Sequence, residues 1–337
     1  MPRSHGRARR RPFAAVMTVL LALLLGAVAG CGAGSSAGGA AAPDGAFHAT
    51  VTGKFGTTTV DRKPVRVVAM SWTDADFALA LGVTPVGLAH TDETPAGLQP
   101  WTAQALGDTR PVQFNVLGSD PIEQVAKLAP DLILATKDYN LAHSYQQLSQ
   151  IAPVVTYVNG VNSDTWQQDL ANVATALGRT TEATTVTADT EAQIAQQRTD
   201  HPELTGKTFS YIIAPTAAGA YTVNSDADVS AKLLDTLGMR LSPAVLGLPT
   251  SGLPGRAQLS MENLAVLDAD VVVATGSPDA LAELAKSPVF NSLSAVRRGA
   301  YVPLDFTSST ALAFPSPLSL RWALTEVLPK LSAAAKP

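Results

Sequence analysis

Short, unbroken runs of apolar residues recur along most of the chain and alternate with longer stretches of mixed polarity. Seven runs rich in β-branched residues are predicted strands: Val65–Ala69, Val86–Ala89, Leu132–Ala135, Val154–Val158, Ser210–Ala214, Val271–Ala274 and Ala300–Val302. Runs of this kind, without polar alternation, are typical of strands covered on both faces of a parallel sheet. Helical patterns separate them, and this order predicts an α/β fold with mostly parallel sheets.

The middle of the chain predicts two consecutive helices. Apolar residues recur at helical spacing from Trp166 to Leu177, and Gly178 is the expected end of this helix. Residues 180–200 then contain neither glycine nor proline, which favours one long helix although the many threonines are weak helix formers. We expect residues 179–205 to connect two lobes as a single helix, an arrangement that permits rocking rather than wide hinge closure.

One motif occurs in both halves of the chain. Glu123–Thr136 is similar to Glu262–Thr275: in each, a glutamate lies eight residues before an aspartate, a helix is predicted between them, and an apolar run follows. Two similar Rossmann-like lobes, residues 60–178 and 206–332, are the simplest explanation.

The N-terminus has a different character from the rest of the chain. Five arginines precede an apolar run from Phe13 to Ala29, which is the order of a secretory signal peptide. The run ends Val-Ala-Gly-Cys31, which resembles the lipobox of bacterial lipoproteins. We therefore expect residues 1–30 to be removed, Cys31 to carry a lipid, and residues 31–59 to form a flexible membrane tether. A plain secretory signal is the alternative.

Composition and sequence motifs limit the classes of function that are expected for this chain. Removing the leader's five arginines from the 24 basic side chains leaves 19 against 28 acids, a net charge of −9, which disfavours nucleic-acid binding. The single cysteine excludes a disulfide scaffold and a cysteine-built zinc site. No G-x-S-x-G nucleophile elbow lies between a predicted strand and a helix, and no G-x-G-x-x-G follows a strand, so no enzyme motif stands out. A hydrolase would need a serine and an acid beside His90 or His143, and a scaffold protein would have a filled cleft.

Several segments in order resemble one family. They are Arg66–Leu88, Ile122–Leu134, Leu148–Pro153, Leu259–Glu262 and Leu312–Leu324. Together they are similar to the class III, helical-backbone substrate-binding proteins of ABC importers, and the last segment is similar to the iron–siderophore members. The resemblance covers about residues 60–330. It implies a monomeric binding protein, not an enzyme, that captures a ferric siderophore between its lobes; haem or cobalamin is the alternative ligand.

The candidate ligand contacts are polar or aromatic residues on loops that follow strands or face the expected cleft. They are Trp72, Thr73, Thr91, Tyr139, Tyr221, Asn224, Arg256 and Phe306. Aromatic rings offer flat apolar walls, and a guanidinium offers a fork of donors to chelate oxygens. Each of these residues also has a structural explanation: Trp72 and Phe306 as packed aromatics, Arg256 in a surface ion pair.

Metal coordination by the protein itself is not expected, because a siderophore already fills the coordination shell of iron. No cofactor is therefore predicted. His90 beside Asp92 and Glu93 is the one place where a direct metal ligand would fit.

Glu123 and Glu262 begin the two copies of the repeat. Asp120 to Glu123 has the pattern of a capping box with proline at the first helical position, and Ser260 to Glu262 also puts an acid in a first turn. Helix capping is a sufficient explanation. The family resemblance implies a second role, in which one glutamate from each lobe docks into the permease dimer.

Overall fold

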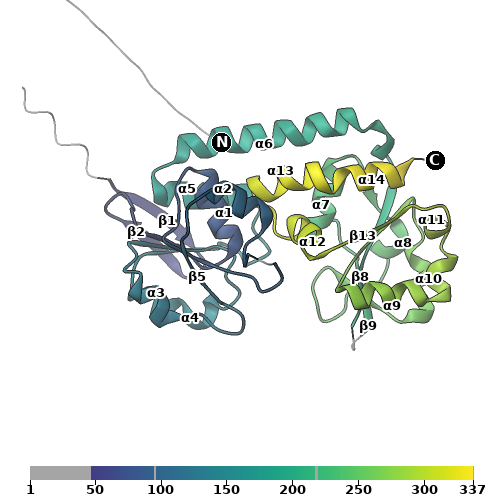
Figure 1. Ribbon diagram of the computed structural model, residues 1–337, viewed down its shortest axis with the longest axis horizontal. Helices are drawn as coiled ribbons and strands as arrows, with labels where there is room; N and C mark the ends of the chain where they lie inside the picture. The colour runs from purple at the N-terminus through teal and green to yellow at the C-terminus, as the bar shows by residue number, and fades with distance from the viewer. Residues whose placement is uncertain (1–46, 95, 217–218, 337) are drawn as a thin grey trace, which may run out of the picture. The chain divides into compact units, whose positions relative to one another are not determined.

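Two β-sheets organise the chain, one from each half (Figure 1). The computed structural model describes residues 47–336 apart from 95 and 217–218. The predicted leader, the lipidation site Cys31 and most of the predicted tether lie outside the described residues.

The first sheet is wholly parallel, with the strand order β5-β4-β3-β6-β7. Its strands are β3 (Val67–Ala69), β4 (Gly87–Ala89), β5 (Val112–Phe114), β6 (Leu132–Ala135) and β7 (Val154–Thr156). Its helices are α1 (Trp72–Ala80), α2 (Pro100–Leu106), α3 (Ile122–Lys127), α4 (Leu141–Leu148) and α5 (Trp166–Leu177). This is the order of a Rossmann half, and the direction of winding reverses between β3 and β6.

The second sheet is mixed. Its order is β11-β9-β8-β12-β13, with β10 beside β8; β8, β10, β12 and β13 pair in parallel, whereas β9 runs antiparallel to both of its neighbours, β8 and β11. The strands are β8 (Thr208–Thr216), β9 (Gly219–Val223), β10 (Arg240–Leu241), β11 (Arg256–Leu259), β12 (Val271–Thr275) and β13 (Tyr301–Leu304). The predicted α/β class with mainly parallel sheets is therefore confirmed, with one antiparallel edge added.

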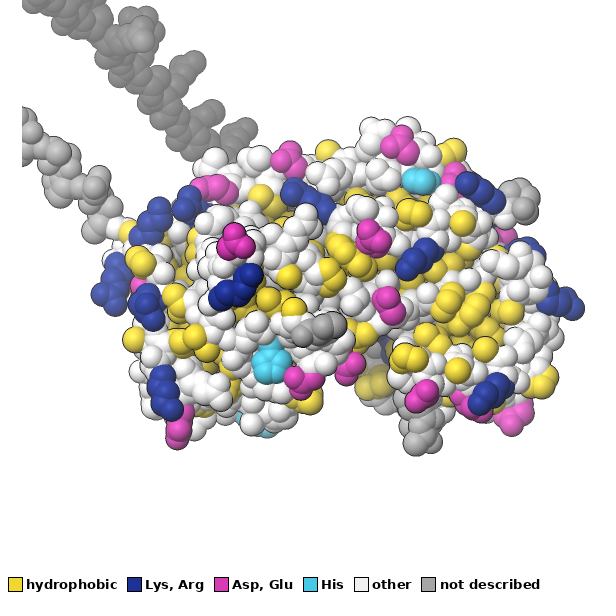
Figure 2. All heavy atoms as spheres, viewed as in Figure 1, with side chains coloured by type: hydrophobic (Ala, Val, Ile, Leu, Met, Phe, Trp, Pro, Cys, Tyr) yellow, Lys and Arg dark blue, Asp and Glu magenta, His cyan; other side chains and the backbone are white. Residues whose placement is uncertain are grey.

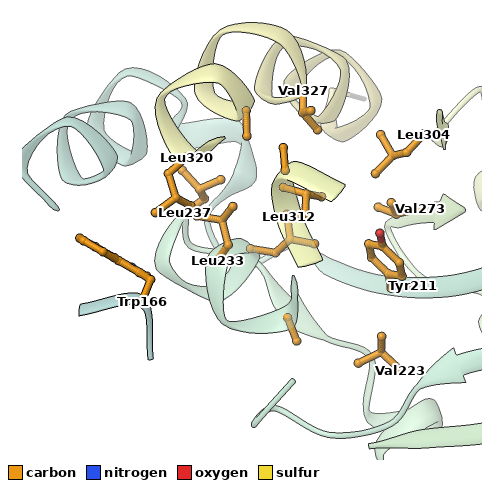
Figure 3. Packing of buried hydrophobic residues seen from close by; sticks show 14 of the residues in the cluster. Trp166, Tyr211, Val223, Leu233, Leu237, Val273, Leu304, Leu312, Leu320 and Val327 are labelled. Atoms are coloured by element: carbon orange, nitrogen blue, oxygen red, sulfur yellow. The ribbon is translucent and has the colours of Figure 1, made fainter. Parts of the chain in front are cut away.

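The remaining helices belong to the second half of the chain. They are α7 (Val229–Thr236), α8 (Pro243–Leu246), α9 (Pro278–Lys286), α10 (Pro288–Ser292), α11 (Ser294–Arg297), α12 (Phe306–Ala313), α13 (Pro317–Glu326) and α14 (Leu328–Ala335), with 3₁₀ helices η1 (Pro202–Leu204) and η2 (Met261–Leu267). Leu233 of α7 and Leu237, the C-cap of α7, meet Leu312 of α12 and Leu320 of α13 in the buried core (Figure 3).

A hairpin precedes the first sheet and corrects the predicted tether. Strands β1 (Ala49–Gly53) and β2 (Gly56–Val60) pair antiparallel. The hairpin is fixed to β7, because Lys54 N donates to Tyr157 O at 2.7 Å and Thr58 Oγ1 donates to Val154 O at 2.6 Å. The prediction of a tether over residues 31–59 is thus wrong from residue 49 onward. The alternating burial of β1 provides the physical reason, since it buries Ala49 and Val51 on one face.

A 21-residue helix, α6 (Thr180–Asp200), follows the first sheet in sequence and precedes the second. Several of its threonines donate to the carbonyl oxygen four residues earlier, as Thr184 and Thr190 do, which satisfies their hydroxyl groups inside the helix. The helix contacts α5, α7 and α13, and it runs beside α13 in Figure 1. It ends at Asp200, so η1 occupies the end of the predicted helix 179–205. No helix within the described residues combines the length and hydropathy needed to cross a bilayer.

The sequence repeat corresponds to a repeated structural role. Asp131, just before β6, accepts hydrogen bonds from the backbone N–H groups of Val65 and Arg66 at 2.8–3.1 Å. Asp270, just before β12, accepts one from Thr208 N at 2.8 Å. In both halves the aspartate therefore ties the start of one strand to the start of its parallel neighbour.

Asp76 of α1 joins three helices through its buried carboxyl group. Its Oδ2 accepts from Trp101 Nε1 of α2 at 2.6 Å and from Ser316 Oγ, the N-cap of α13, at 2.8 Å. Its Oδ1 lies 2.6 Å from Thr102 Oγ1. The rings of Trp101 and Trp322 are 5.3 Å apart and extend the same contact between α2 and α13. Asp76 thus attaches the C-terminal helix α13 to the first sheet's helices across 240 residues of sequence.

Replacing Asp76 by alanine is expected to destabilise the protein strongly. Three buried hydroxyl and indole donors would lose their acceptor, and each unsatisfied buried group costs about 1–3 kcal/mol. We expect the free energy of unfolding to fall by about 3 kcal/mol or more in urea denaturation. Asp61→Ala, at a carboxylate that is 79% exposed, is the matched control and should change little. An Asp76→Ala variant as stable as the parent would contradict this role.

The same carboxyl group predicts a pH dependence of stability. Burial raises the pKa of Asp76 to about 7, although three side-chain hydrogen bonds oppose the rise. The folded state therefore holds a proton that the unfolded chain releases near pH 4, so this group's contribution falls as pH rises from about 4 to 7. Asparagine mimics the protonated acid, because its amide can donate to Thr102 while its oxygen accepts from Trp101 and Ser316. Asp76→Asn should fold and should lose less stability than the parent between pH 5 and 8; an unchanged pH profile would refute the assignment.

Candidate functional site

The site lies where the winding of the first sheet reverses, at the carboxyl ends of β3 and β6. Ligands of open α/β sheets bind at this position, because the loops of neighbouring strands diverge there. Ser71 and Trp72 follow β3, and residues 136–140 follow β6. The predicted contacts Trp72 and Tyr139 therefore occupy the two loops that flank the switch point.

Asp74 fastens these two loops together. Its Oδ2 accepts from Ser71 Oγ at 2.6 Å, and its Oδ1 accepts from the backbone and hydroxyl of Thr136 at 2.9 and 2.7 Å. The side chain is fully buried, and this burial raises the pKa of Asp74 despite the hydrogen bonds. The positions of Trp72 and Tyr139 are thus fixed relative to each other by a buried carboxyl group.

Phe314 brings the two aromatic residues together. Its ring packs edge-on against Trp72, with centroids 5.7 Å apart, and against Tyr139 at 6.4 Å. Tyr139 remains 59% exposed, so its ring is available to a ligand. Asn162 holds it from the other side by donating from Nδ2 to the Tyr139 hydroxyl at 2.6 Å. Trp72, Tyr139 and Phe314, which we call the aromatic cluster, therefore join the first sheet to the segment between α12 and α13.

Phe314 and Asn162 were not among the predicted site residues. Phe314 ends α12 and directly precedes Pro315, so an aromatic residue before proline at a helix end is the one signal in the sequence. Asn162 lies in a polar loop and carries no such signal.

Lys137 is a buried cation that is already paired. Its Nζ lies 2.7 Å from Asp169 Oδ2 of α5 and donates to Val161 O at 2.9 Å. Burial outweighs this cation and raises the pKa of Asp169 to about 7. The role of Lys137 is to hold the loop after β7, which includes Asn162, against the loop after β6.

Asp120 and Asp138 form a carboxyl pair beside the cluster, in which Asp138 is buried and Asp120 is half-buried. Burial, and next the charge of Asp120, raise the pKa of Asp138 above its usual range. Asn140 bridges the pair: its backbone N donates to Asp138 Oδ1 at 2.8 Å, and its Nδ2 donates to Asp120 Oδ1 at 3.3 Å. Asp120 does not cap α3, whose N-cap is Pro121 without a side-chain hydrogen bond. The predicted capping box is therefore wrong.

Two other predicted contacts in the first half are buried. Thr73 is fully buried in α1, and Thr91 is 6% exposed. Thr91 Oγ1 accepts from Glu93 N at 3.2 Å, and Thr91 N donates to Gly97 O at 2.9 Å, so this residue closes its own loop. Neither side chain lines a surface that a ligand could reach in this structure. Helix packing and turn formation bury them, so direct ligand contact by Thr73 and Thr91 stays a prediction that this structure does not favour.

The predicted contacts in the second half serve the second sheet. Asn224 is 7% exposed and donates to Leu248 O at 2.9 Å and to Thr250 Oγ1 at 3.2 Å. Arg256 Nη1 forms an ion pair with Asp228, the N-cap of α7. Both side chains therefore have partners within the second half of the chain. For Arg256 this agrees with the alternative given in the sequence analysis, an ion pair with a structural role.

Tyr221 and Phe306 are half-buried. Tyr221 pairs with Ile213 and Gln258 in the sheet, and Phe306 begins α12 directly after its N-cap Asp305. The contacts among the described residues do not join Tyr221 or Phe306 to the aromatic cluster.

The histidines form local pairs. His90 Nε2 lies 3.0 Å from Asp92 Oδ1, and Asp92 Oδ2 also accepts from Asn115. Glu93 does not complete a metal site with them: across residues 47–336, outside the gaps, histidine, cysteine and acidic side chains form no group of three that could hold a metal. His143 is exposed on α4.

Glu123 and Glu262 are exposed in the first turns of α3 and η2. Neither helix has a side-chain hydrogen bond at its N-cap, and η2 is a 3₁₀ rather than an α-helix. The two carboxylates occupy equivalent places in the two copies of the repeat.

Comparison with known proteins agrees with this architecture. The family model described as "Periplasmic binding protein" matches residues 67–306, more than two-thirds of the chain. The putative ABC transporter substrate-binding lipoprotein YhfQ of Bacillus subtilis is 26% identical over 276 residues, covering 76% of this chain and 80% of its own. The Fe(3+) dicitrate-binding periplasmic protein FecB of Escherichia coli is 28% identical over 220 residues, covering 62% and 68%.

A solved structure gives the same result for the fold. PiaA of Streptococcus pneumoniae, in complex with ferrichrome, superposes with a TM-score of 0.72 at 27% identity, covering 85% of this chain and 98% of PiaA. The chain therefore belongs to the periplasmic binding protein family and is a binding protein rather than an enzyme.

Proposed function

We propose that this protein is the extracytoplasmic substrate-binding component of an ABC importer and that it carries a ferric siderophore. The observation that carries the proposal is the aromatic cluster at the switch point of the first sheet, with the exposed ring of Tyr139. Relatives named for binding Fe(3+) dicitrate and solved with ferrichrome support an iron chelate as the ligand.

The chemistry of such a ligand matches the cluster. A ferric siderophore supplies all the oxygen ligands of its iron, so a carrier needs to recognise the outer surface of the chelate. That surface combines apolar arms with polar oxygens, and flat aromatic side chains bind it through area burial. Tyr139 and Phe314 are the contacts that we propose for this role, with Trp72 behind them.

Delivery to the permease is proposed to use Glu123 and Glu262. Each is exposed, and each lies at the matching position of the repeat. Two equivalent carboxylates suit a partner with two equivalent cationic pockets, as a permease dimer has. We further propose that Cys31 carries a lipid anchor and that the chain from Cys31 to the hairpin is the tether.

Fluorescence titration with ferric siderophores tests ligand binding. The parent protein should show saturable quenching of its tryptophan emission by at least one ferric chelate, after correction for absorbance. Phe314→Ala and Tyr139→Ala should each weaken binding by about tenfold, since each removes an aromatic wall worth roughly 1–2 kcal/mol.

Val65→Ala is the matched control for these variants, because Val65 is 77% exposed and lies before β3, at the opposite edge of the sheet. It should leave affinity unchanged. Tight binding of haemin or cobalamin alone would keep the carrier role and replace the ligand. Equal affinity of all three variants and the parent would place the ligand elsewhere.

Charge reversal tests docking separately from ligand binding. Glu123→Lys together with Glu262→Lys should lower uptake in cells by about tenfold or more, because like charges would face the permease. Ligand affinity of the purified variant should remain that of the parent. Glu326→Lys makes the same substitution at one exposed carboxylate of α13 and should transport normally. Normal uptake by the double variant would exclude these residues from docking.

A further inference from the structure

We infer that the ligand is a neutral or cationic ferric chelate rather than an anionic one, because the edge that carries the aromatic cluster is acidic and its cations are already paired. This inference rests on the proposed function and specifies its substrate class.

The titratable side chains in the loops at the carboxyl edge of the first sheet are mostly acidic, although its raised pKa leaves Asp138 mostly protonated at pH 7. They are residues 70–71, 90–99, 115–121, 136–140 and 157–165, which follow the five parallel strands and therefore meet at one edge. Their acids are Asp92, Glu93, Asp120, Asp138 and Asp164, whereas their only lysine or arginine is Lys137. Two of the acids, Asp92 and Glu93, are exposed.

The single lysine is not available to an anionic ligand. Lys137 is 6% exposed and ion-paired with Asp169, as described above. Breaking this pair would leave the fully buried carboxyl group of Asp169 without its partner, which is a cost to stability. The nearest histidine, His90, lies against Asp92.

In the described part of the second half, the loops at the corresponding edge add no lysine or arginine. The segments that follow β12 and β13 contribute Asp279 and Asp305 and no basic residue. Arg256, the predicted anion-binding residue, is paired with Asp228. Over the face shown in Figure 2 as a whole, acidic and basic side chains are both exposed.

The aromatic cluster favours the same sign of ligand charge. The face of an aromatic ring attracts a cation through its quadrupole, and an exposed tyrosine ring provides such a face. An ammonium group on a chelate arm could lie over Tyr139 and near the acidic loops at once. An anionic carboxylate or catecholate arm needs a cationic side chain as its partner. Among the described residues of these loops, no lysine or arginine lacks an ion-pair partner.

A single chelate prepared in three charge states separates the effect of ligand charge from the effect of ligand shape. Ferrioxamine B carries a free ammonium group; acetylating the amine makes it neutral, and succinylating it makes it anionic, while the ferric trihydroxamate core stays the same. We expect the cationic and neutral forms to bind at least about tenfold more tightly than the anionic form at low salt, with the difference shrinking in high salt. Ferric dicitrate and a ferric tricatecholate complete the panel as anionic chelates of other shapes.

A variant with fewer charges tests whether the loop that contains Asp92 and Glu93 causes the preference for ligand charge. Asp92→Asn with Glu93→Gln should reduce the difference between the cationic and anionic forms by about threefold or more, because it removes the two exposed acids. Asp61→Asn removes an exposed acid directly after β2, and it should leave the difference in affinity between the cationic and anionic forms unchanged.

The outcomes separate this inference from the proposed function. Tightest binding by the anionic trihydroxamate, by dicitrate or by the tricatecholate would overturn the inference and leave the carrier role intact. Equal affinity for the three charge states would also overturn it. Absence of binding across the whole panel would overturn the proposed function itself.

Discussion

The arrangement of the C-terminal helices depends on the hydrogen bonds made by the buried carboxyl group of Asp76. It receives donors from α2 and from the N-cap of α13, so one side chain of α1 connects residues that are far apart in sequence. Because α13 also contacts α6, the long helix is held between segments from both halves of the chain. Phe314 lies two residues before Ser316, and the same contact therefore fixes the position of the aromatic cluster.

A second buried acid, Asp74, performs the matching task at the site. It ties the loop after β3 to the loop after β6, where a doubly wound sheet offers space for a ligand. The charges of the neighbouring acidic side chains are partly neutralised by bound protons, by Lys137 or by backbone N–H donors. Few cationic side chains near the site lack an ion-pair partner. A site of this kind combines a rigid frame with a negative field, which favours apolar contact and discriminates against anions.

The fold was largely predictable because its strands are continuous apolar runs, and all seven predicted strands have counterparts in the two sheets. That pattern did not predict strands β5, β9, β10 and β11 or the hairpin β1–β2. The site was predicted in part: Trp72 and Tyr139 follow parallel strands, whereas Phe314 comes from a distant turn. Arg256 shows the limit, since sequence spacing does not reveal that Asp228 is its ion-pair partner.

The position of iron in crystals of the protein with a bound ferric chelate tests the central claim most directly, because anomalous scattering locates the metal without assumptions about the ligand. The account predicts an iron peak beside the exposed ring of Tyr139 and Phe314, at the carboxyl ends of β3 and β6. An iron peak beside Asn224 and Arg256, away from the aromatic cluster, would contradict it.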